Sequence, residues 1–218
     1  MKALLMAAGL GTRLRPLTQT TPKPLLPLAG RPVIDHLLEG LVAAGIREIS
    51  INLHHLGEQL RQHLEASASS DAMLRFTEEP ALLETGGTIA AALDWLGDEP
   101  FAVINADIFT DFDFARLPTT LGDDLAHLVV TPTPDWREAG DFEVQDGRVV
   151  RRGASHVYCS IGVLSPHLLD NHPPAPFSWR DPLFAAVSAG RVSAQEHLGR
   201  WHDIGTLAQY ESLQADYP

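Results

Sequence analysis

The 218-residue sequence contains a single cysteine, Cys159. One thiol cannot form an internal disulfide, and low cysteine usage is typical of a reducing compartment, so we expect the cytoplasm. Long apolar runs are also missing: none approaches the roughly 20 residues that a membrane-spanning helix needs, so we expect no membrane partner. The apolar start breaks at Gly9 without a small-residue cleavage site, which argues against a signal peptide.

Positive charge is scarce. Sixteen Lys and Arg residues face 28 Asp and Glu residues, which gives a net charge of −12. Nucleic acids are held mainly by broad basic surfaces, so this composition excludes nucleic acid as the main partner. A bound phosphate group must instead be held by a local cluster of cations. With 44% hydrophobic residues, the chain is large enough for one α/β domain with a full core, and we expect a monomer or a small homo-oligomer.

Two common phosphate-binding motifs do not occur near the N-terminus. A Walker loop needs a lysine at a fixed distance after Gly11, and a dinucleotide fingerprint needs a third glycine where Leu14 stands. The glycine loop that follows the apolar run Ala3–Ala8 therefore belongs to another class.

This loop is followed by cations. Arg13 and Arg15 come directly after Gly11, and Lys23 comes after a polar turn. Glycines without a Cβ let a polyanion approach the backbone amides closely, while cations meet its charge from the side. The segment thus predicts a phosphate site; the alternative is an ordinary strand-to-helix turn with solvated basic residues.

Strand-like and helix-like segments alternate through the first half of the chain. The predicted strands are Ala3–Ala8, Ile46–Leu53, Met73–Thr77 and Phe101–Asn105, and the predicted helices are Val33–Ala44, Gly57–Glu65 and Thr88–Leu96, with a short turn at Ala66–Ser70. Such alternation predicts an α/β, Rossmann-like fold with a mixed, mostly parallel central sheet and helices on both faces.

After Asp107 the pattern changes to short strands joined by turns. These strands are predicted at Leu125–Thr131, Phe142–Val144, Arg148–Arg151 and Val157–Leu164. The dipeptide Asp146-Gly147 predicts a hairpin. The proline-rich segment Asn171–Pro182 predicts an ordered loop or lid.

The N-terminal motifs resemble the signature of the sugar-1-phosphate nucleotidyltransferase family. In that signature a Gly-x-Gly-Thr-Arg-Leu loop is followed about ten residues later by Pro-Lys-x-Leu-x-Pro. The matching residues are Gly9, Gly11, Thr12, Arg13 and Leu14, then Pro22, Lys23, Leu25 and Pro27. The resemblance covers essentially the whole chain and implies the nucleotidyltransferase fold, with a nucleotide-binding part at about residues 1–110 and a small β-rich sugar-binding part at about 111–218 of a single domain.

The resemblance implies an enzyme with two small-molecule substrates, a nucleoside triphosphate and a sugar 1-phosphate, and Mg²⁺ as cofactor. It is closest to members that use UTP and N-acetylmuramate 1-phosphate in peptidoglycan recycling; GTP with mannose 1-phosphate and dTTP with glucose 1-phosphate stay open. It implies nucleotide contacts from Ala8, Gly9, Gly11, Thr12, Arg13 and Lys23, with Arg13 and Lys23 as catalytic cations. The alternative from another functional class is a nucleotide-sugar-binding regulatory module that has lost catalysis.

Two acidic residues are candidates for the metal site. Asp107 follows the strand that ends at Asn105, and ligands of open α/β sheets lie beyond the carboxyl ends of strands. Asp203 lies in a Trp-x-Asp-x-Gly-Thr segment that resembles a carboxy-terminal motif of the family. Mg²⁺ commonly takes one or two carboxylates and completes its shell with phosphates and water. The alternatives are a turn cap for Asp107 and a cap before a helix near Thr206 for Asp203.

The resemblance also implies where base and sugar bind. Gly86 and Gly87, just before the predicted helix, match a turn on which the nucleobase lies, and Glu84, Thr85 or a nearby backbone group would read its edge. Simple turn geometry is the alternative. The residues implied on the sugar side are Asn105, which would also contact the nucleotide, Gly140, Glu143, Arg152 and Ser160. Arg152 would replace a lysine from a Glu-Lys-Pro run that this sequence lacks.

Two other chemistries are disfavoured. The ten histidines include His54-His55 and the pair His197 and His202, but no HExxH motif or cysteine cluster accompanies them, so we expect no zinc site. Cys159 lies in an apolar run, where packing is its usual role and nucleophilic catalysis is not expected.

Overall fold

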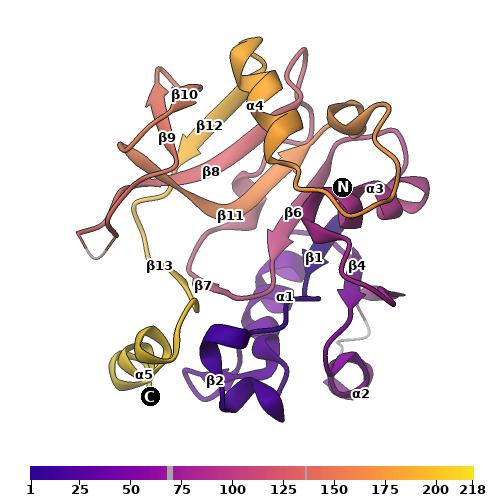
Figure 1. Cartoon of the computed structure of the whole chain (residues 1–218), viewed down its shortest axis with the longest axis vertical. Helices are drawn as coiled ribbons and strands as arrows, with labels where there is room; N and C mark the ends of the chain where they lie inside the picture. The colour runs from indigo at the N-terminus through magenta and orange to yellow at the C-terminus, as the bar shows by residue number, and fades with distance from the viewer. Residues whose placement is uncertain (68–70, 136) are drawn as a thin grey trace. The chain divides into compact units, whose positions relative to one another are not determined.

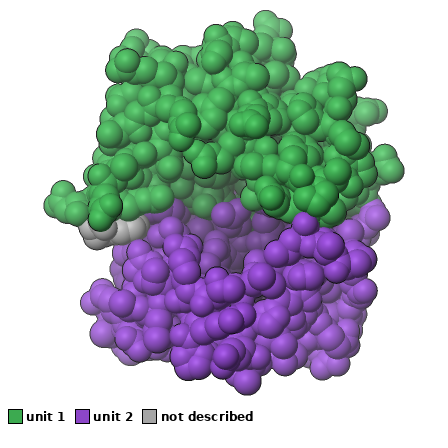
Figure 2. All heavy atoms as spheres, viewed as in Figure 1, with its two compact units in different colours: residues 1–4, 83–104, 116–199 green, residues 5–82, 105–115, 200–218 purple. Residues whose placement is uncertain are grey.

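The computed structural model describes residues 1–67, 71–135 and 137–218. By contacts within the chain it divides into two compact units (Figure 2). Unit 1 comprises residues 1–4, 83–104 and 116–199, and unit 2 comprises residues 5–82, 105–115 and 200–218. Each unit is therefore assembled from segments that lie far apart in the sequence.

Unit 2 contains most of the short N-terminal elements and the C-terminal helix, which Figure 1 labels α5. Its elements are the end of β1 (Ala3–Met6), η1 (Thr12–Leu14), η2 (Leu17–Gln19), η3 (Lys23–Leu25), β2 (Pro27–Leu28), β3 (Arg31–Pro32), α1 (Val33–Ala43), β4 (Glu48–Leu53), α2 (Gly57–Ser67), β5 (Met73–Glu78), β7 (Ile108–Thr110), β13 (Trp201–Asp203) and α5 (Leu207–Asp216).

The strands of unit 2 bring three loops to one sheet edge. The strand order is β5-β4-β1, and β4 and β5 are parallel, with Glu48 opposite Met73 and Leu53 opposite Glu78. The carboxyl ends of parallel strands meet at the same edge of a sheet. The Ala7 N–H, just after β1, donates to the side chain of Asn52 on β4 at 2.6 Å, so the end of β1 lies at this edge too.

A buried hydrophobic cluster joins the two ends of the chain within unit 2. Its members are Leu14, Leu26, Leu28, Val33, Phe109, Ile204, Tyr210 and Leu213. Burying each such side chain contributes about 1.5–3 kcal/mol. The hydroxyl of Tyr210 also donates to the Pro27 carbonyl oxygen at 2.8 Å. This cluster positions the segments that carry Arg13 and Lys23 against those that carry Asp107 and Asp203.

Unit 1 holds the remaining helices and strands. They are α3 (Glu84–Leu96), β6 (Phe101–Asn105, whose last residue belongs to unit 2), η4 (Phe114–Arg116, which crosses the boundary), β8 (Ala126–Pro132), β9 (Phe142–Gln145), β10 (Arg148–Arg152), β11 (His156–Leu164), η5 (Pro166–Leu169), α4 (Arg180–Ser188) and β12 (Val192–Glu196). The strand order is β6-β11-β8-β12-β10-β9.

The pairing in unit 1 is mixed. β8 and β12 are parallel, whereas β11 is antiparallel to both β6 and β8. The chain therefore has the predicted mixed α/β fold with a central sheet, and this prediction is confirmed. The hairpin predicted at Asp146-Gly147 is also confirmed: Gln145 pairs with Arg148, and both turn residues have positive φ, as a two-residue hairpin loop requires.

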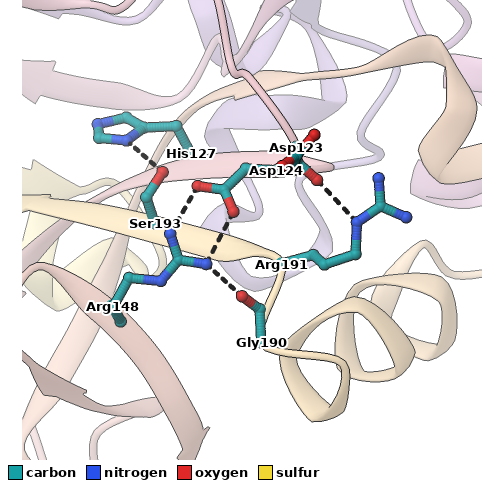
Figure 3. Close-up of polar contacts among 7 residues, drawn as sticks. All are labelled: Asp123, Asp124, His127, Arg148, Gly190, Arg191 and Ser193. Carbon is teal, nitrogen blue, oxygen red and sulfur yellow. Dashed lines mark hydrogen bonds and ion pairs between the residues drawn. The ribbon is translucent and has the colours of Figure 1, made fainter.

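A polar cluster fixes this hairpin within unit 1 (Figure 3). The Arg148 guanidinium donates to both carboxylate oxygens of Asp124, at 2.8 and 2.7 Å, and also to the Gly190 carbonyl oxygen. The His127 Nδ1 lies 3.0 Å from the Ser193 hydroxyl. A bidentate, charge-assisted pair has a fixed geometry, so it sets how β10 lies against β12.

Most predicted elements are present, with ends displaced by a few residues. The main correction concerns α3, which begins at Glu84 and not at Thr88, so Gly86 and Gly87 lie in its first turn. Of the turn predicted at Ala66–Ser70, Ala66 and Ser67 are instead the last residues of α2, and residues 68–70 lie outside the described residues. Among the described residues, none of the helices has both the length and the apolar character needed to cross a membrane.

Candidate active site

The site in unit 2 begins where β6 ends. Asp107 lies in the turn between β6 and β7, two residues after Asn105. β7 pairs antiparallel with β13, in a register that places Asp203 opposite Ile108. The Ile204 N–H then donates to the Asp107 carbonyl oxygen at 3.0 Å. This short ladder brings together the backbone segments that carry the two candidate metal ligands, from distant parts of the chain.

Lys23 completes this group. It begins η3, and its ammonium group forms an ion pair with the Asp107 carboxylate. The side chains are 12% and 30% exposed, so the pair is partly withdrawn from water. An ammonium group has three donors, so Lys23 can bind a phosphate oxygen while it keeps Asp107. The turn-cap alternative for Asp107 is thus not needed to explain its position.

The Asp203 carboxylate has an unusual environment. Its Oδ1 is buried and has no hydrogen-bond partner among the described residues. Buried polar atoms are rarely left unsatisfied, and such an atom calls for an explanation such as an ion. The cap of α5 is Thr206, whose hydroxyl accepts from the Gln209 N–H at 3.3 Å, so Asp203 is not the helix cap.

Two acidic residues on adjacent backbone segments, one of them with an unsatisfied carboxylate oxygen, fit a hard divalent cation that takes its other ligands from phosphates and water. No group of three or more His, Cys, Asp or Glu side chains suited to a metal occurs in the part of the chain that the structure describes. A metal at this position would therefore take most of its ligands from the substrates and from water.

We call Ala7–Gly11 the phosphate loop. Gly11 has φ +60°, and a Cβ there would lie 2.7 Å from the Thr18 side chain, so only glycine fits without strain. Gly9 has open space where a Cβ would point, Ala8 is buried, and Thr12 begins η1. Apart from Leu10 the loop consists of small residues, and Gly9 and Leu10 are exposed, so a polyanion could approach the backbone there.

Arg13 lies near Gly205, in the segment that carries Asp203. A Cβ built on Gly205 would be 3.7 and 3.8 Å from the two terminal nitrogens of Arg13. Gly205 comes two residues after Asp203, so unit 2 gathers Arg13, Lys23, Asp107 and Asp203 in one neighbourhood. Burial, with the nearby Arg200 cation, lowers the pKa of His202 and favours its neutral form.

Gly86 and Gly87, in unit 1, have a structural partner. Their N–H groups donate to the Phe177 carbonyl oxygen at 2.8 and 3.3 Å. A Cβ would lie 2.3 Å from the Phe177 ring at Gly86 and 2.2 Å from the Ala175 carbonyl oxygen at Gly87. Both glycines are therefore needed for the close approach of the predicted ordered loop, and α3 begins early because this loop caps it.

Two of the sugar-side candidates, Gly140 and Glu143, contact the same segment of unit 1. The Ala154 N–H donates to the Glu143 carboxylate at 3.0 Å, and a Cβ on Gly140 would lie 2.7 Å from the Ala154 carbonyl group. This hydrogen bond, assisted by the Ser155 hydroxyl, lowers the pKa of Glu143. Contacts with Ala154 thus give a structural explanation for the residue type at both positions. Their contacts with the sugar stay a prediction.

Of the remaining sugar-side candidates, Asn105 ends β6, Arg152 ends β10 and Ser160 lies in β11. The Arg152 guanidinium stacks over the Phe184 ring at 4.9 Å, a cation–π contact. Ser160 has φ +59° at an irregularity in the pairing of β11 with β8. A non-glycine residue in this region is strained, and such strain often marks functional sites. Burial raises the pKa of the Cys159 thiol, which agrees with packing as its role.

Sequence reasoning missed a buried polar network behind the phosphate loop. Asn52 and Glu79 are each 4% exposed, and the Asn52 amide donates to the Glu79 carboxylate at 2.8 Å. The available signal was a polar residue within the apolar strand Ile-Ser-Ile-Asn-Leu. Such a residue in a buried strand needs a specific partner.

The comparisons with known proteins show the family and agree with the fold. The model of the nucleotidyl transferase family matches residues 2–144, and the chain belongs to this family. It is 37% identical to the N-acetylmuramate alpha-1-phosphate uridylyltransferase of Neisseria meningitidis serogroup B, over 99% of this chain and 97% of that protein. It is 34% identical to the enzyme of the same name from Caulobacter vibrioides, over 93% and 91%. The solved structure of HddC from Yersinia pseudotuberculosis shares the fold, with a TM-score of 0.84 at 22% identity, covering 100% of this chain and 99% of that one.

Proposed function

We propose that this protein transfers a uridylyl group from UTP to N-acetylmuramate 1-phosphate and releases pyrophosphate, in the recycling of peptidoglycan. The observation that carries the proposal is the cluster of Arg13, Lys23, Asp107 and Asp203 in unit 2. The choice of substrates is supported by the similarity to two uridylyltransferases across nearly the whole chain.

In the proposed reaction, an oxygen of the sugar 1-phosphate attacks the α-phosphorus of UTP. The bond to the β-phosphate oxygen breaks, and pyrophosphate leaves with the electron pair. No general base is needed, because the attacking phosphate is already ionised near pH 7. The barrier comes from bringing anions together, so positioned cations supply most of the catalysis.

Each residue has a distinct task. Arg13 neutralises charge that develops on the leaving pyrophosphate, and Lys23 donates to an oxygen of the α-phosphate or the incoming phosphate. The phosphate loop presents backbone amides to the nucleotide. Asp107 and Asp203 would hold Mg²⁺, which supplies Lewis-acid stabilisation of phosphate oxygens when it is bound.

The remaining assignments belong to the same proposal. Gly86, Gly87 and Asn105 contact the nucleotide, and Asn105 also contacts the sugar with Gly140, Glu143, Arg152 and Ser160. The nucleotide-binding part is about residues 1–110 and the sugar-binding part about 111–218. The location in the cytoplasm and the state of a monomer or small homo-oligomer also stay predictions.

A matrix of substrates tests the proposal. The purified protein is given UTP, dTTP, GTP or CTP with N-acetylmuramate, glucose or mannose 1-phosphate, with magnesium present or chelated, and pyrophosphate is measured. We expect release with UTP and the muramate compound only, lost on chelation. Equal or better release with GTP and mannose 1-phosphate would overturn the substrate assignment. No pyrophosphate release with any pair of substrates would favour a nucleotide-binding module without catalysis.

A further inference from the structure

The segment that ends β4 reaches the start of the phosphate loop. The Asn52 side chain is buried, and its Oδ1 accepts from the Ala7 N–H at 2.6 Å. Its Nδ2 donates to the Glu79 carboxylate at 2.8 Å. The Asn52 amide therefore links the first residue of the loop to the residue that follows β5, and rotation of the amide would break both bonds.

The same segment reaches the end of the loop through His55. The His55 Nε2 lies 2.8 Å from the Thr18 carbonyl oxygen. A carbonyl oxygen only accepts, so the Nε2 carries the proton. The Thr18 hydroxyl in turn donates to the Gly11 carbonyl oxygen at 2.7 Å, and the Thr18 side chain is 1% exposed.

His54 supports this arrangement from the other side. Its Nδ1 lies 2.7 Å from the Glu79 carbonyl oxygen and must donate to it. The Glu79 N–H donates to the Leu53 carbonyl oxygen at 2.8 Å. The two adjacent histidines thus have different acceptors, Glu79 and Thr18, and His55 alone faces the loop side.

From these contacts we infer that Asn52 and His55 are positioning residues for the nucleoside triphosphate. Asn52 fixes the Ala7 end of the phosphate loop, and His55 fixes the Gly11 end through Thr18. Between these two points the loop amides keep the spacing that phosphate oxygens need. Neither residue touches the reacting atoms. The inference rests on the proposed function, because it assigns the loop to the triphosphate.

Substitutions at His55 separate the hydrogen bond from the ring. His55→Phe keeps an aromatic ring and removes the donor, whereas His55→Gln keeps a donor. His63→Phe is the matched control, because His63 bonds Asp35 at 2.8 Å and does not contact the loop. Asn52→Asp is a second probe: the carboxylate still accepts from Ala7, but it cannot donate to Glu79 and repels its charge.

The measurements are KM and kcat with UTP and with the sugar phosphate, together with amide hydrogen exchange. Misplacing catalytic geometry by about 1 Å can cost up to about a hundredfold in rate, so we expect His55→Phe and Asn52→Asp to lower kcat/KM for UTP by about tenfold or more. The KM for the sugar phosphate should hardly change. Amides of the phosphate loop should exchange faster, His55→Gln should restore most of the loss, and His63→Phe should behave like wild type.

Unchanged UTP kinetics and unchanged loop exchange in both His55→Phe and Asn52→Asp would overturn the inference. An equal loss of kcat/KM for UTP in His55→Phe and His55→Gln would also overturn the role of the hydrogen-bond donor. If wild type turns over no substrate pair, the proposed function fails by itself. In that case the UTP affinity of wild type and of the variants, measured by calorimetry, is compared together with amide exchange of the phosphate loop. These two measurements still decide whether Asn52 and His55 position the triphosphate.

Discussion

Lys23 and Asp107 form an ion pair although 84 residues separate them in the sequence. The pair exists because the hydrophobic cluster of unit 2 brings η3 next to the turn after β6. A cation held beside a carboxylate is already oriented before an anionic substrate arrives. Such pre-organisation reduces the reorganisation that charge development would otherwise require.

Replacing Lys23 by glutamine should reduce kcat by about a hundredfold, because losing one positioned cation costs on the order of 3 kcal/mol in the barrier. The free energy of unfolding should fall by only about 1 kcal/mol, since the pair is partly exposed to water. Steady-state pyrophosphate release and urea unfolding measure the two effects.

Arg31→Gln is the matched control for Lys23→Gln. It removes the more exposed Arg31–Glu39 pair, also in unit 2, and should leave kcat unchanged. Full activity of Lys23→Gln would remove Lys23 from the phosphate-binding group.

Asp203→Asn keeps the size of the side chain and removes its charge. We expect turnover to drop by about a hundredfold or more and half-maximal activity to need more magnesium, because an amide oxygen is a weaker ligand than a carboxylate. A magnesium titration of activity checks this expectation. Asp170→Asn, at an exposed position, should retain the wild-type curve. A magnesium titration of Asp203→Asn that matches the wild-type curve would exclude Asp203 from the metal site.

Gly11 and Gly30 separate backbone strain from steric contact. Both have positive φ, +60° and +78°, but only Gly11 has a close neighbour, the Thr18 side chain, where a Cβ would be placed. Alanine in the left-handed region costs about 1–2 kcal/mol. Gly11→Ala should therefore destabilise the protein more than Gly30→Ala and should alone raise the KM for UTP. Equal losses in urea unfolding, with equal KM values, would contradict this explanation.

His127 predicts a pH dependence of stability. Burial lowers the pKa of folded His127 below its ordinary 6.5, with Asp124 opposing the shift in part. As the pH falls through 6.5, the unfolded chain therefore binds more protons at this site than the folded chain, and the free energy of unfolding decreases.

His127→Gln should weaken this pH dependence. Urea unfolding at about pH 7.5 and about pH 5 should show a smaller loss of stability in His127→Gln than in wild type. The exposed His167 supplies the control, since His167→Gln should keep the wild-type difference. If His127→Gln loses as much stability between the two pH values as wild type does, the imidazole is not responsible for the pH dependence.

Local sequence signals were sufficient to predict the regular helices and turns, and to propose the N-terminal glycine loop with its cations as a phosphate site. The α1 helix was predicted to within one residue of its end, because its apolar spacing is regular and Gly45 follows it. The Asp146-Gly147 turn was equally clear. In contrast, β7 and β13 each have three residues and are defined only by pairing with one another, about 90 positions apart. No local pattern could reveal that ladder, so the proximity of Asp107 and Asp203 had to come from the resemblance to a family.

The start of α3 shows a second kind of error. Glycines lower helix propensity, so the sequence favoured a turn at Gly86 and Gly87 and a helix only from Thr88. In the structure the Phe177 carbonyl oxygen accepts the hydrogen bonds of both glycines, which allows the helix to begin earlier. A contact with a segment about 90 residues away thus decided the local conformation.

The C-terminal helix α5 carries none of the proposed phosphate or metal contacts, yet Tyr210 and Leu213 pack in the cluster that includes Leu14 and Leu26. The Tyr217 carbonyl oxygen also accepts from the Ala29 N–H at 3.0 Å. Changes that displace residues 207–217 would therefore weaken the packing behind the segments that carry Arg13 and Lys23. Enzymes engineered from this scaffold should retain these residues, although none of them is proposed to contact a substrate.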